Sequence, residues 1–359
     1  MRNIYLVTST GVSILMAHLA LHDGNSSANA ELLSQTGYTV LAVIMGVFSM
    51  AGILLNVLVI VVTVRHRQLR QPLSYALVNL AICDLGCAVF GGLPTTVTSA
   101  MGYFSLGQVG CVLEGFAVSF FGISSLCTIG VISVERYIVV CYPMGAVLHA
   151  VAGVVLSWVW SFVWNTPPLF GWGSYELEGV KTSCSPNWYS RDTGNMSYII
   201  MYFFLCFALP FSVIIVSYSR LLWTLHQVSE GGSTTRVELQ VACMIVVMVL
   251  AFLVTWLPYA VMALAVILDS SLYIDPLIAT IPVYLAKSST VYNPIIYIFM
   301  NRQHRITEAR EIMLFCSLNL TVGGFVVLNP NLTVGGFVVL NLTVGGFVVL
   351  NLIVGGFVA

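Results

Sequence analysis

The chain has 359 residues, of which 58% are hydrophobic and 8% are charged, and its formal net charge is −1. Soluble domains carry about 25% charged residues, so this composition argues against a soluble enzyme, and its hydrophobicity argues against disorder. The near-zero charge provides no basic surface for nucleic acid. No cysteine pair has the C-x-x-C spacing of a zinc site, so we expect no metal. A polytopic helical membrane protein is the class that remains.

Seven apolar runs are long enough to cross a bilayer, which takes about 20 helical residues. They lie at residues 38–64, 73–99, 109–141, 147–170, 198–226, 237–268 and 276–300. They are longer than β-barrel strands and lack the alternation of such strands. The sequence therefore predicts an all-α membrane protein with a seven-transmembrane helix bundle over residues 38–300.

Arginine placement predicts the orientation of the bundle, because basic residues concentrate in cytoplasmic loops. Arginines follow the first and seventh spans, end the third and fifth, and precede the sixth, whereas acidic residues predominate at the opposite ends. We therefore expect residues 1–37 to form an extracellular N-terminal segment. On that side Asn25 and Asn195 begin N-x-S sequons and are candidate glycosylation sites.

The segments after the last span differ from the rest of the chain. Residues 301–316 are expected to form a short cytoplasmic amphipathic helix. Beyond them, over residues 317–359, the unit LNLTVGGFVV recurs about every ten residues, which is too short for a helical solenoid repeat. The repeat is uncharged, β-prone and liable to aggregate. We interpret it as a translated tandem DNA repeat or a faulty gene model, outside the functional domain.

Lys287 is the single lysine within any predicted span, seven residues before Pro294. A lysine at this depth costs several kcal/mol unless it is paired or neutral. The nearer outer end lies about ten residues away, which is farther than a lysine stem reaches by snorkelling. A structural ion pair is one reading. A functional amine is the reading that we favour, because a neutral amine facing a cavity can form a Schiff base with an aldehyde.

A protonated imine in this setting needs an anion, because an unpaired buried charge is strongly destabilising. Glu114 begins a long uncharged stretch of the third span and is one candidate. Glu178, in the loop between the fourth and fifth spans, is the other, although it is equally compatible with a solvated loop acid. Cys111 and Cys184 are both expected on the oxidising outer side. A bridge between them would pin the loop of Glu178 over the third span and cover a cavity.

Glu135, Arg136 and Tyr137 end the third span at its cytoplasmic side. Arg136 can pair with Glu135 and with Glu238 at the base of the sixth span. An ion pair that a helix movement releases is a two-state element. The alternative is an interfacial arginine that anchors a helix end.

Polar residues also occur deep in the spans, where they need partners. They are Asn56 in the first span, Asp84 in the second and Asn293 in the seventh. Prolines that distort helices occur in the fifth, sixth and seventh spans: Pro210, Pro258 and Pro294. We expect Trp256, two residues before the second of these, to face the same cavity as Lys287.

These motifs together resemble the rhodopsin-like (class A) G-protein-coupled receptors. The resemblance rests on Asn56, LAICD ending at Asp84, ERY at 135–137, Trp158, Pro210 with Tyr218, TWLPY at 255–259 and NPIIY at 293–297. Their order and spacing fit across about residues 38–305. Lys287, seven residues before the proline of NPIIY, matches the retinal-binding lysine of opsins. Among opsins, GWGSYELEG and LAKSSTVYNPIIYIFMN are most similar to the parapinopsins, which are non-visual opsins of the pineal complex.

This resemblance implies that Lys287 holds 11-cis-retinal as a Schiff base. Glu114 and Glu178 match the counter-ion positions of vertebrate visual opsins and of bistable opsins, respectively. Trp256 and Tyr259 would line the chromophore. Light would isomerise the retinal to the all-trans form, and in the parapinopsins the photoproduct stays bound until a second photon reverts it.

The resemblance also implies a heterotrimeric G protein of the transducin or Gi type as partner, in the plasma membrane or a photoreceptor outer-segment membrane. Separation of the helix ends that carry Arg136 and Glu238, with Tyr218 and Tyr297 moving inward, would expose the binding site for the G protein. Arrestin is a further expected partner, although the tail lacks the usual Ser/Thr-rich segment. The cytoplasmic loops that would contact the G protein are short, and Cys243 replaces a usual arginine.

Two other functions fit parts of the same pattern. A retinal photoisomerase, an enzyme-like opsin, would also use Lys287. A class A receptor for a diffusible ligand, or a transporter, would carry no pigment. The intact ERY and NPIIY motifs favour a signalling receptor that is not an enzyme.

Overall fold

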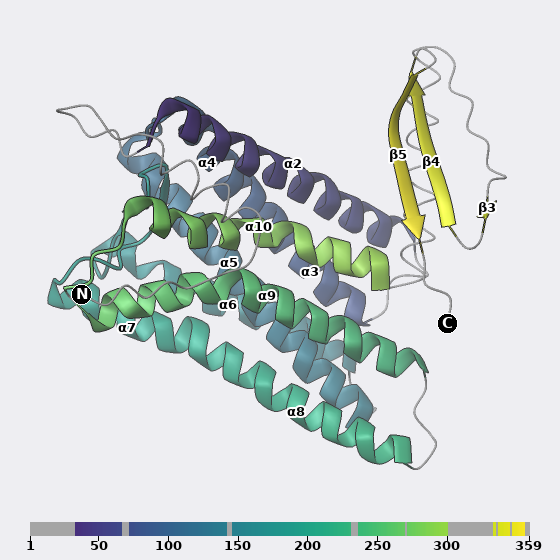
Figure 1. Ribbon diagram of the computed structural model, residues 1–359. Coiled ribbons are helices and arrows are strands. Elements are labelled where there is room, and N and C mark those ends of the chain that lie inside the picture. The colour runs from purple at the N-terminus through teal and green to yellow at the C-terminus, as the bar shows by residue number, and fades with distance from the viewer. Residues whose placement is uncertain are drawn as a thin grey trace. The chain divides into compact units, whose positions relative to one another are not determined.

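The computed structural model describes residues 33–66, 72–141, 146–230, 236–269, 271–300, 333–334, 337–344 and 347–355. Its long helices run alongside one another (Figure 1). The first three helical segments are α2 (Gln35–Arg65), the series α3 (Pro72–Cys87), η2 (Ala88–Gly92) and α4 (Leu93–Met101), and α5 (Gly107–Cys141). The next four are α6 (Ala146–Asn165), the series α7 (Thr193–Tyr202), η4 (Phe203–Ala208) and α8 (Leu209–Glu230), α9 (Arg236–Leu268), and α10 (Pro276–Met300). Of these, α5 packs against α3, α6, α8 and α9, which makes it the central helix.

The seven predicted spans each correspond to one helical segment, so the predicted seven-helix bundle is confirmed. Within the described residues, five segments are long and apolar enough to cross a membrane by length and hydropathy alone. They are Gln35–Arg65, Leu73–Met101, Gly107–Val139, Thr193–Leu221 and Val241–Leu268, with mean hydropathies of 1.8 to 2.6. The cytoplasmic helix expected at 301–316 lies outside the described residues.

The fourth helix ends at Asn165, five residues before the predicted end at 170, and a 3₁₀ turn, η3 (Pro167–Phe170), follows it. Pro167 and Pro168 have no backbone N–H, so they cannot continue the helical hydrogen bonds. Tyrosine hydroxyls instead donate hydrogen bonds to two of the last backbone carbonyls of α6. Tyr198 donates to the Trp164 carbonyl at 3.0 Å, and Tyr175 donates to the Asn165 carbonyl at 2.8 Å.

Two segments of π-helix interrupt the second and fifth spans, of which the sequence predicted a helix distortion only in the fifth. Each ends just before a proline, since η2 precedes Pro94 and η4 precedes Pro210. A proline ring collides with the carbonyl four residues earlier, and widening the preceding turn relieves that collision. The predicted distortion at Pro210 is therefore present, whereas α9 and α10 continue as helices through Pro258 and Pro294.

The loop between the fourth and fifth spans folds as an antiparallel hairpin of β1 (Tyr175–Glu178) and β2 (Ser183–Pro186). A disulfide joins Cys111 near the start of α5 to Cys184 in β2, which confirms the predicted bridge. The hairpin turn lies against α10, where the Val180 N–H donates to the Thr280 hydroxyl at 2.9 Å. Gly179 in this turn has φ of +59°, and a side chain there would collide with Thr280.

The polar residues inside the bundle find partners, as predicted. Asn293 donates to Asp84 at 2.8 Å, and Ser125 donates to the same carboxylate at 3.4 Å. Asn56 donates to the backbone carbonyls of Gly52 and Thr290, each at 2.8 Å. These bonds join the first, second, third and seventh spans at mid-depth.

The chain divides into a unit that ends at Ile296 and a second unit that begins at Tyr297. The described strands of the second unit are β3 (Thr333–Val334), β4 (Phe337–Val344) and β5 (Phe347–Gly355). They pair antiparallel in that order, and β4 aligns with β5 from one end to the other with one irregularity at Leu342 and Thr343. The repeat predicted to be β-prone therefore forms strands.

Removal of residues 317–359 should leave the melting temperature of the helical bundle unchanged and reduce aggregation. The described strands of the repeat pair only with one another, and uncharged β-prone segments associate between chains. Thermal circular dichroism and size-exclusion chromatography of residues 1–316 and of the full chain measure both effects. Val339→Lys in the full chain is the matched control, because one charge in β4 should also reduce the aggregate. A lower melting temperature of the shortened chain would show that the repeat supports the bundle.

Candidate functional site

Lys287 is buried in α10, with 7% of its surface exposed. Its ammonium donates to Thr95 Oγ1 at 2.5 Å, to Glu114 Oε1 at 2.7 Å and to Ser183 Oγ at 2.9 Å. These three acceptors come from α4, α5 and β2. The amine therefore does not snorkel to the membrane surface, and three separate elements fix its position.

Glu114 is the ion-pair partner of Lys287. Both side chains are almost fully buried, and Glu114 Oε1 also accepts a bond from Thr95 at 2.8 Å. Its second oxygen, Oε2, is buried and has no hydrogen-bond partner among the described residues. A buried pair of this kind depends on both members, because removing one leaves the other charge without compensation.

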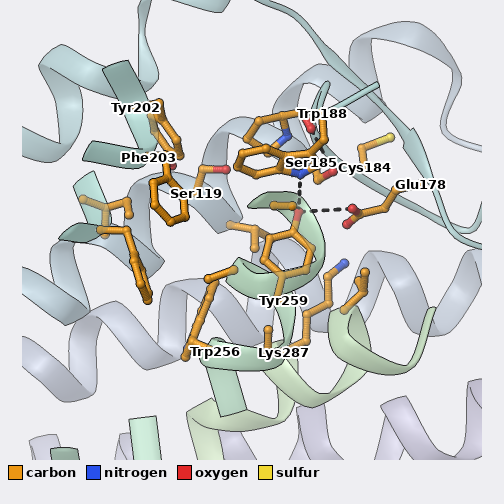
Figure 2. Close-up of a pocket in the computed structure, with 18 residues that line it drawn as sticks. Ser119, Glu178, Cys184, Ser185, Trp188, Tyr202, Phe203, Trp256, Tyr259 and Lys287 are labelled. Carbon is orange, nitrogen blue, oxygen red and sulfur yellow. Dashed lines mark hydrogen bonds between the residues drawn. The ribbon is translucent and has the colours of Figure 1, made fainter. Parts of the chain in front are cut away.

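A cavity adjoins Lys287. Its walls are mostly apolar and aromatic, and they include Val118, Ile123, Phe203, Phe207, Trp256 and Ala263. Figure 2 shows Lys287 at the side of this cavity near Glu178, and Trp256 and Phe203 along its walls.

Glu178 lines the same cavity from the end of β1 and is 7% exposed, so it is not a solvated loop acid. Its Oε2 accepts a hydrogen bond from the Tyr259 hydroxyl at 3.1 Å. Burial raises the pKa of the Glu178 carboxyl to about 7, against hydrogen bonds and the Lys287 charge, which lower it. Both predicted carboxylates are thus buried near the Lys287 amine, but only Glu114 forms an ion pair with it.

The aromatic residues predicted for this site are in place. Trp256 stacks on Phe252 with ring centroids 5.7 Å apart and meets the Tyr259 ring edge-on at 6.5 Å. The sequence pattern did not single out Thr95, Ser183 or Trp188. The last of these lies four residues after Cys184 and donates to the Tyr259 hydroxyl at 2.8 Å. The disulfide could have pointed to Trp188, because it fixes this loop over the cavity.

A sequence model described as "7 transmembrane receptor (rhodopsin family)" matches residues 55–297. The chain belongs to the rhodopsin family. A parapinopsin of Ictalurus punctatus is 67% identical over 294 residues, which cover 79% of this chain and 84% of that protein. A pinopsin of Columba livia is 46% identical over 274 residues, covering 74% and 78%. The crystal structure of squid rhodopsin superposes with a TM-score of 0.73 at 26% identity, covering 83% of this chain and 93% of that one.

These relatives make the chain an opsin, a light-activated receptor among the seven-transmembrane proteins. Membership of the rhodopsin family implies a multi-pass membrane protein that couples to heterotrimeric G proteins. The predicted resemblance to the parapinopsin group is confirmed.

The C-terminal end of α5 carries the predicted ion pair between Glu135 and Arg136. The Arg136 guanidinium donates twice to this carboxylate, at 2.5 and 3.0 Å. Tyr137 follows in the same helix, and Tyr218 is buried in α8. Glu238 lies in α9, but its side chain is outside the described part of the structure, so a pair with Arg136 stays a prediction. Pro294 and Tyr297 lie in the last two turns of α10.

The two sequons have different outcomes. Asn25 lies outside the described residues. Asn195 is buried in the first turn of α7, and its amide donates to the carbonyls of Asn187 at 2.7 Å and Ser190 at 3.3 Å. This geometry leaves no free amide for a glycan on the folded chain. Among the described residues no cluster of three or more His, Cys, Asp or Glu side chains could hold a metal ion.

Glu114→Gln should lower the free energy of unfolding of the retinal-free protein by about 3–5 kcal/mol, because it leaves the Lys287 charge buried and unpaired. The thermal melting temperature in detergent measures the effect. Glu178→Gln is the matched control and should cost much less, because Glu178 forms no ion pair with Lys287. Glu114→Gln combined with Lys287→Met should recover most of the loss. Equal melting temperatures of the two single variants would contradict the assigned pairing.

Proposed function

We propose that this opsin binds 11-cis-retinal as a Schiff base on Lys287 and signals light to a heterotrimeric G protein. The observation that carries the proposal is the buried amine of Lys287 at the wall of an apolar cavity. A primary amine is the group that condenses with an aldehyde. When bound, retinal supplies a light-driven isomerisation from the 11-cis to the all-trans form.

The residues around the cavity fit such a ligand. Its apolar and aromatic walls match a polyene, and its polar groups gather at the end where Lys287 lies. Glu114 Oε2 is a buried acceptor without a hydrogen-bond partner among the described residues. An anion with spare accepting capacity beside the amine can stabilise a positive nitrogen in this low-dielectric environment.

The two carboxylates take different roles in this proposal. Glu114 neutralises Lys287 in the retinal-free protein, as their 2.7 Å contact supports. Glu178 lines the cavity, whereas Glu114 does not, so Glu178 is placed to face a nitrogen that extends into the cavity. We assign Glu178 as the counter-ion of the photoproduct, which would stay bound and revert with a second photon.

The signal would pass along α9, which carries Trp256 in the cavity and begins at Arg236 near the cytoplasmic side. The Glu135–Arg136 ion pair lies at the adjoining end of α5, and its release would be the two-state element of the switch. Movement of α9 away from α5, with Tyr218 and Tyr297 turning inward, would expose the site for a transducin- or Gi-type protein. Asp84, Asn56 and Asn293 would transmit the change through their hydrogen bonds at mid-depth. Arrestin would compete for the same opening, in a plasma or outer-segment membrane with the N-terminus outside.

A retinal photoisomerase is the alternative that shares Lys287. The ion-paired Arg136 favours the receptor, because an isomerase has no need of a cytoplasmic switch. A receptor for a diffusible ligand would need no amine inside the cavity.

Lys287→Ala should abolish the absorption band that forms when 11-cis-retinal is added to the purified protein, because the Schiff base nitrogen is lost. Lys181→Ala removes the only other lysine and is the matched control, which should form the band normally. A band retained in Lys287→Ala would refute the linkage. Light-dependent nucleotide exchange on a Gi-type protein should accompany the band. Net release of 11-cis-retinal without such exchange would favour the isomerase.

Glu178→Gln should remove most of the visible absorption of the photoproduct, whereas Glu114→Gln should remove less of it. The reason is that only the Glu178 carboxylate lines the cavity, and a cationic nitrogen without its anion loses its proton. Spectra recorded after a first and a second illumination of each variant measure the effect. The reverse ranking of the two variants would assign the photoproduct counter-ion to Glu114.

A further inference from the structure

A chain of two hydrogen bonds links Trp188 to the Glu178 carboxylate through Tyr259 (Figure 2). The Trp188 Nε1–H lies 2.8 Å from the Tyr259 hydroxyl oxygen, and that oxygen lies 3.1 Å from Glu178 Oε2. All three side chains line the cavity. The chain therefore joins the extracellular loop to the acid that faces Lys287.

The chemistry of the indole sets the direction of this chain. An indole N–H can only donate, so the Tyr259 oxygen must accept from Trp188. The single hydroxyl proton of Tyr259 is then free to point toward Glu178. A donor that is itself accepting a hydrogen bond is a stronger donor, and its bond to an ionised carboxylate is stronger than one to a neutral acid. This arrangement favours the charged form of Glu178.

The backbone around Trp188 is fixed by neighbouring contacts. The Asn187 side chain accepts from the N–H groups of Tyr189 and Ser190, at 3.2 and 3.0 Å, which closes a turn over Trp188. The Arg191 guanidinium donates to the Val266 carbonyl at the end of α9, at 2.6 Å. The loop is thus tied to the same helix that carries Tyr259.

The surroundings of Glu178 make its ionisation sensitive to such a donor. The charged and titratable groups that face it are Lys287 from α10, Glu114 from α5, Tyr259 from α9 and Tyr189 from its own loop. Burial raises the pKa of Glu178 to about 7. A modest change in hydrogen bonding therefore changes the charge of this carboxyl in the neutral range.

We propose that Trp188 is a positioning residue that orients the Tyr259 hydroxyl toward Glu178 and thereby keeps this acid ionised at neutral pH. The inference deepens the proposed function, on which it rests for the role of Glu178 as counter-ion. In this proposal the loop residue Trp188 helps to set the charge of Glu178, the acid that would face the chromophore nitrogen.

The test titrates Glu178 in the full, retinal-free chain. The infrared carbonyl band of protonated carboxyl groups is recorded against pH, and subtraction of Glu178→Gln spectra isolates the Glu178 signal. Trp188→Phe removes the indole N–H and should raise the titration midpoint by about half a pH unit, because the carboxylate loses part of its stabilisation. Trp172→Phe is the matched control, since Trp172 donates to Ser197 at 2.9 Å and takes no part in the chain, and it should leave the midpoint unchanged.

Tyr259→Phe completes a double-mutant cycle. It should raise the midpoint by about one to two pH units, because the direct bond to the carboxylate is lost. Adding Trp188→Phe to Tyr259→Phe should then cause no further shift. A midpoint unchanged by Tyr259→Phe, or a Trp188→Phe shift that persists in the double variant, would overturn the proposal. The first of these outcomes decides the matter even if Trp188→Phe does not fold.

The titration needs no chromophore, so its result is independent of the proposed function. A missing absorption band in the wild-type protein would refute retinal binding and leave the measured midpoints intact. A normal band with unshifted midpoints would refute the role of Trp188 alone.

Discussion

The structure of this opsin depends on one buried ion pair, between Lys287 and Glu114. Two charges removed from water are tolerated only when the ion pair has good geometry and the remaining donors and acceptors of both groups form hydrogen bonds. Thr95 and Ser183 supply part of that satisfaction, at 2.5 and 2.9 Å from the amine. The pair therefore requires α4, α5, α10 and the β-hairpin to meet at one point. Displacement of any of these elements would leave a charge without its partners in an apolar interior.

The hairpin is part of the core because the Cys111–Cys184 disulfide holds it to the central helix. Its register aligns Glu178 with Ser183 across the two strands. One strand thus supplies the serine that accepts from Lys287, and the other supplies the second acid of the cavity. This hairpin therefore forms a wall of the site, although a loop between two spans would be expected to lie at the surface.

Much of the fold could be predicted because span length and arginine placement are local properties of the sequence. Lys287, Glu114 and the cysteines were also identifiable, since charged groups are rare in apolar segments and so stand out. Thr95, Ser183 and Trp188 could not be found in this way. A threonine or serine is common in any helix or loop, and only contacts between distant segments give these three a role. The π-helical turn before Pro94 was missed for a related reason, because helical periodicity does not report a single widened turn.

The site contains two acids, Glu114 and Glu178, and one amine, and this imbalance has a physical consequence. Two carboxylates that face one cation in a low-dielectric interior cannot both be ionised without cost, because each disfavours the charge of the other. The structure resolves the conflict by pairing Glu114 with the amine and burying Glu178 with a pKa of about 7. The charge of Glu178 is therefore set by burial, which raises its pKa, and by its hydrogen bonds, including that from Tyr259, and the Lys287 charge, which lower it.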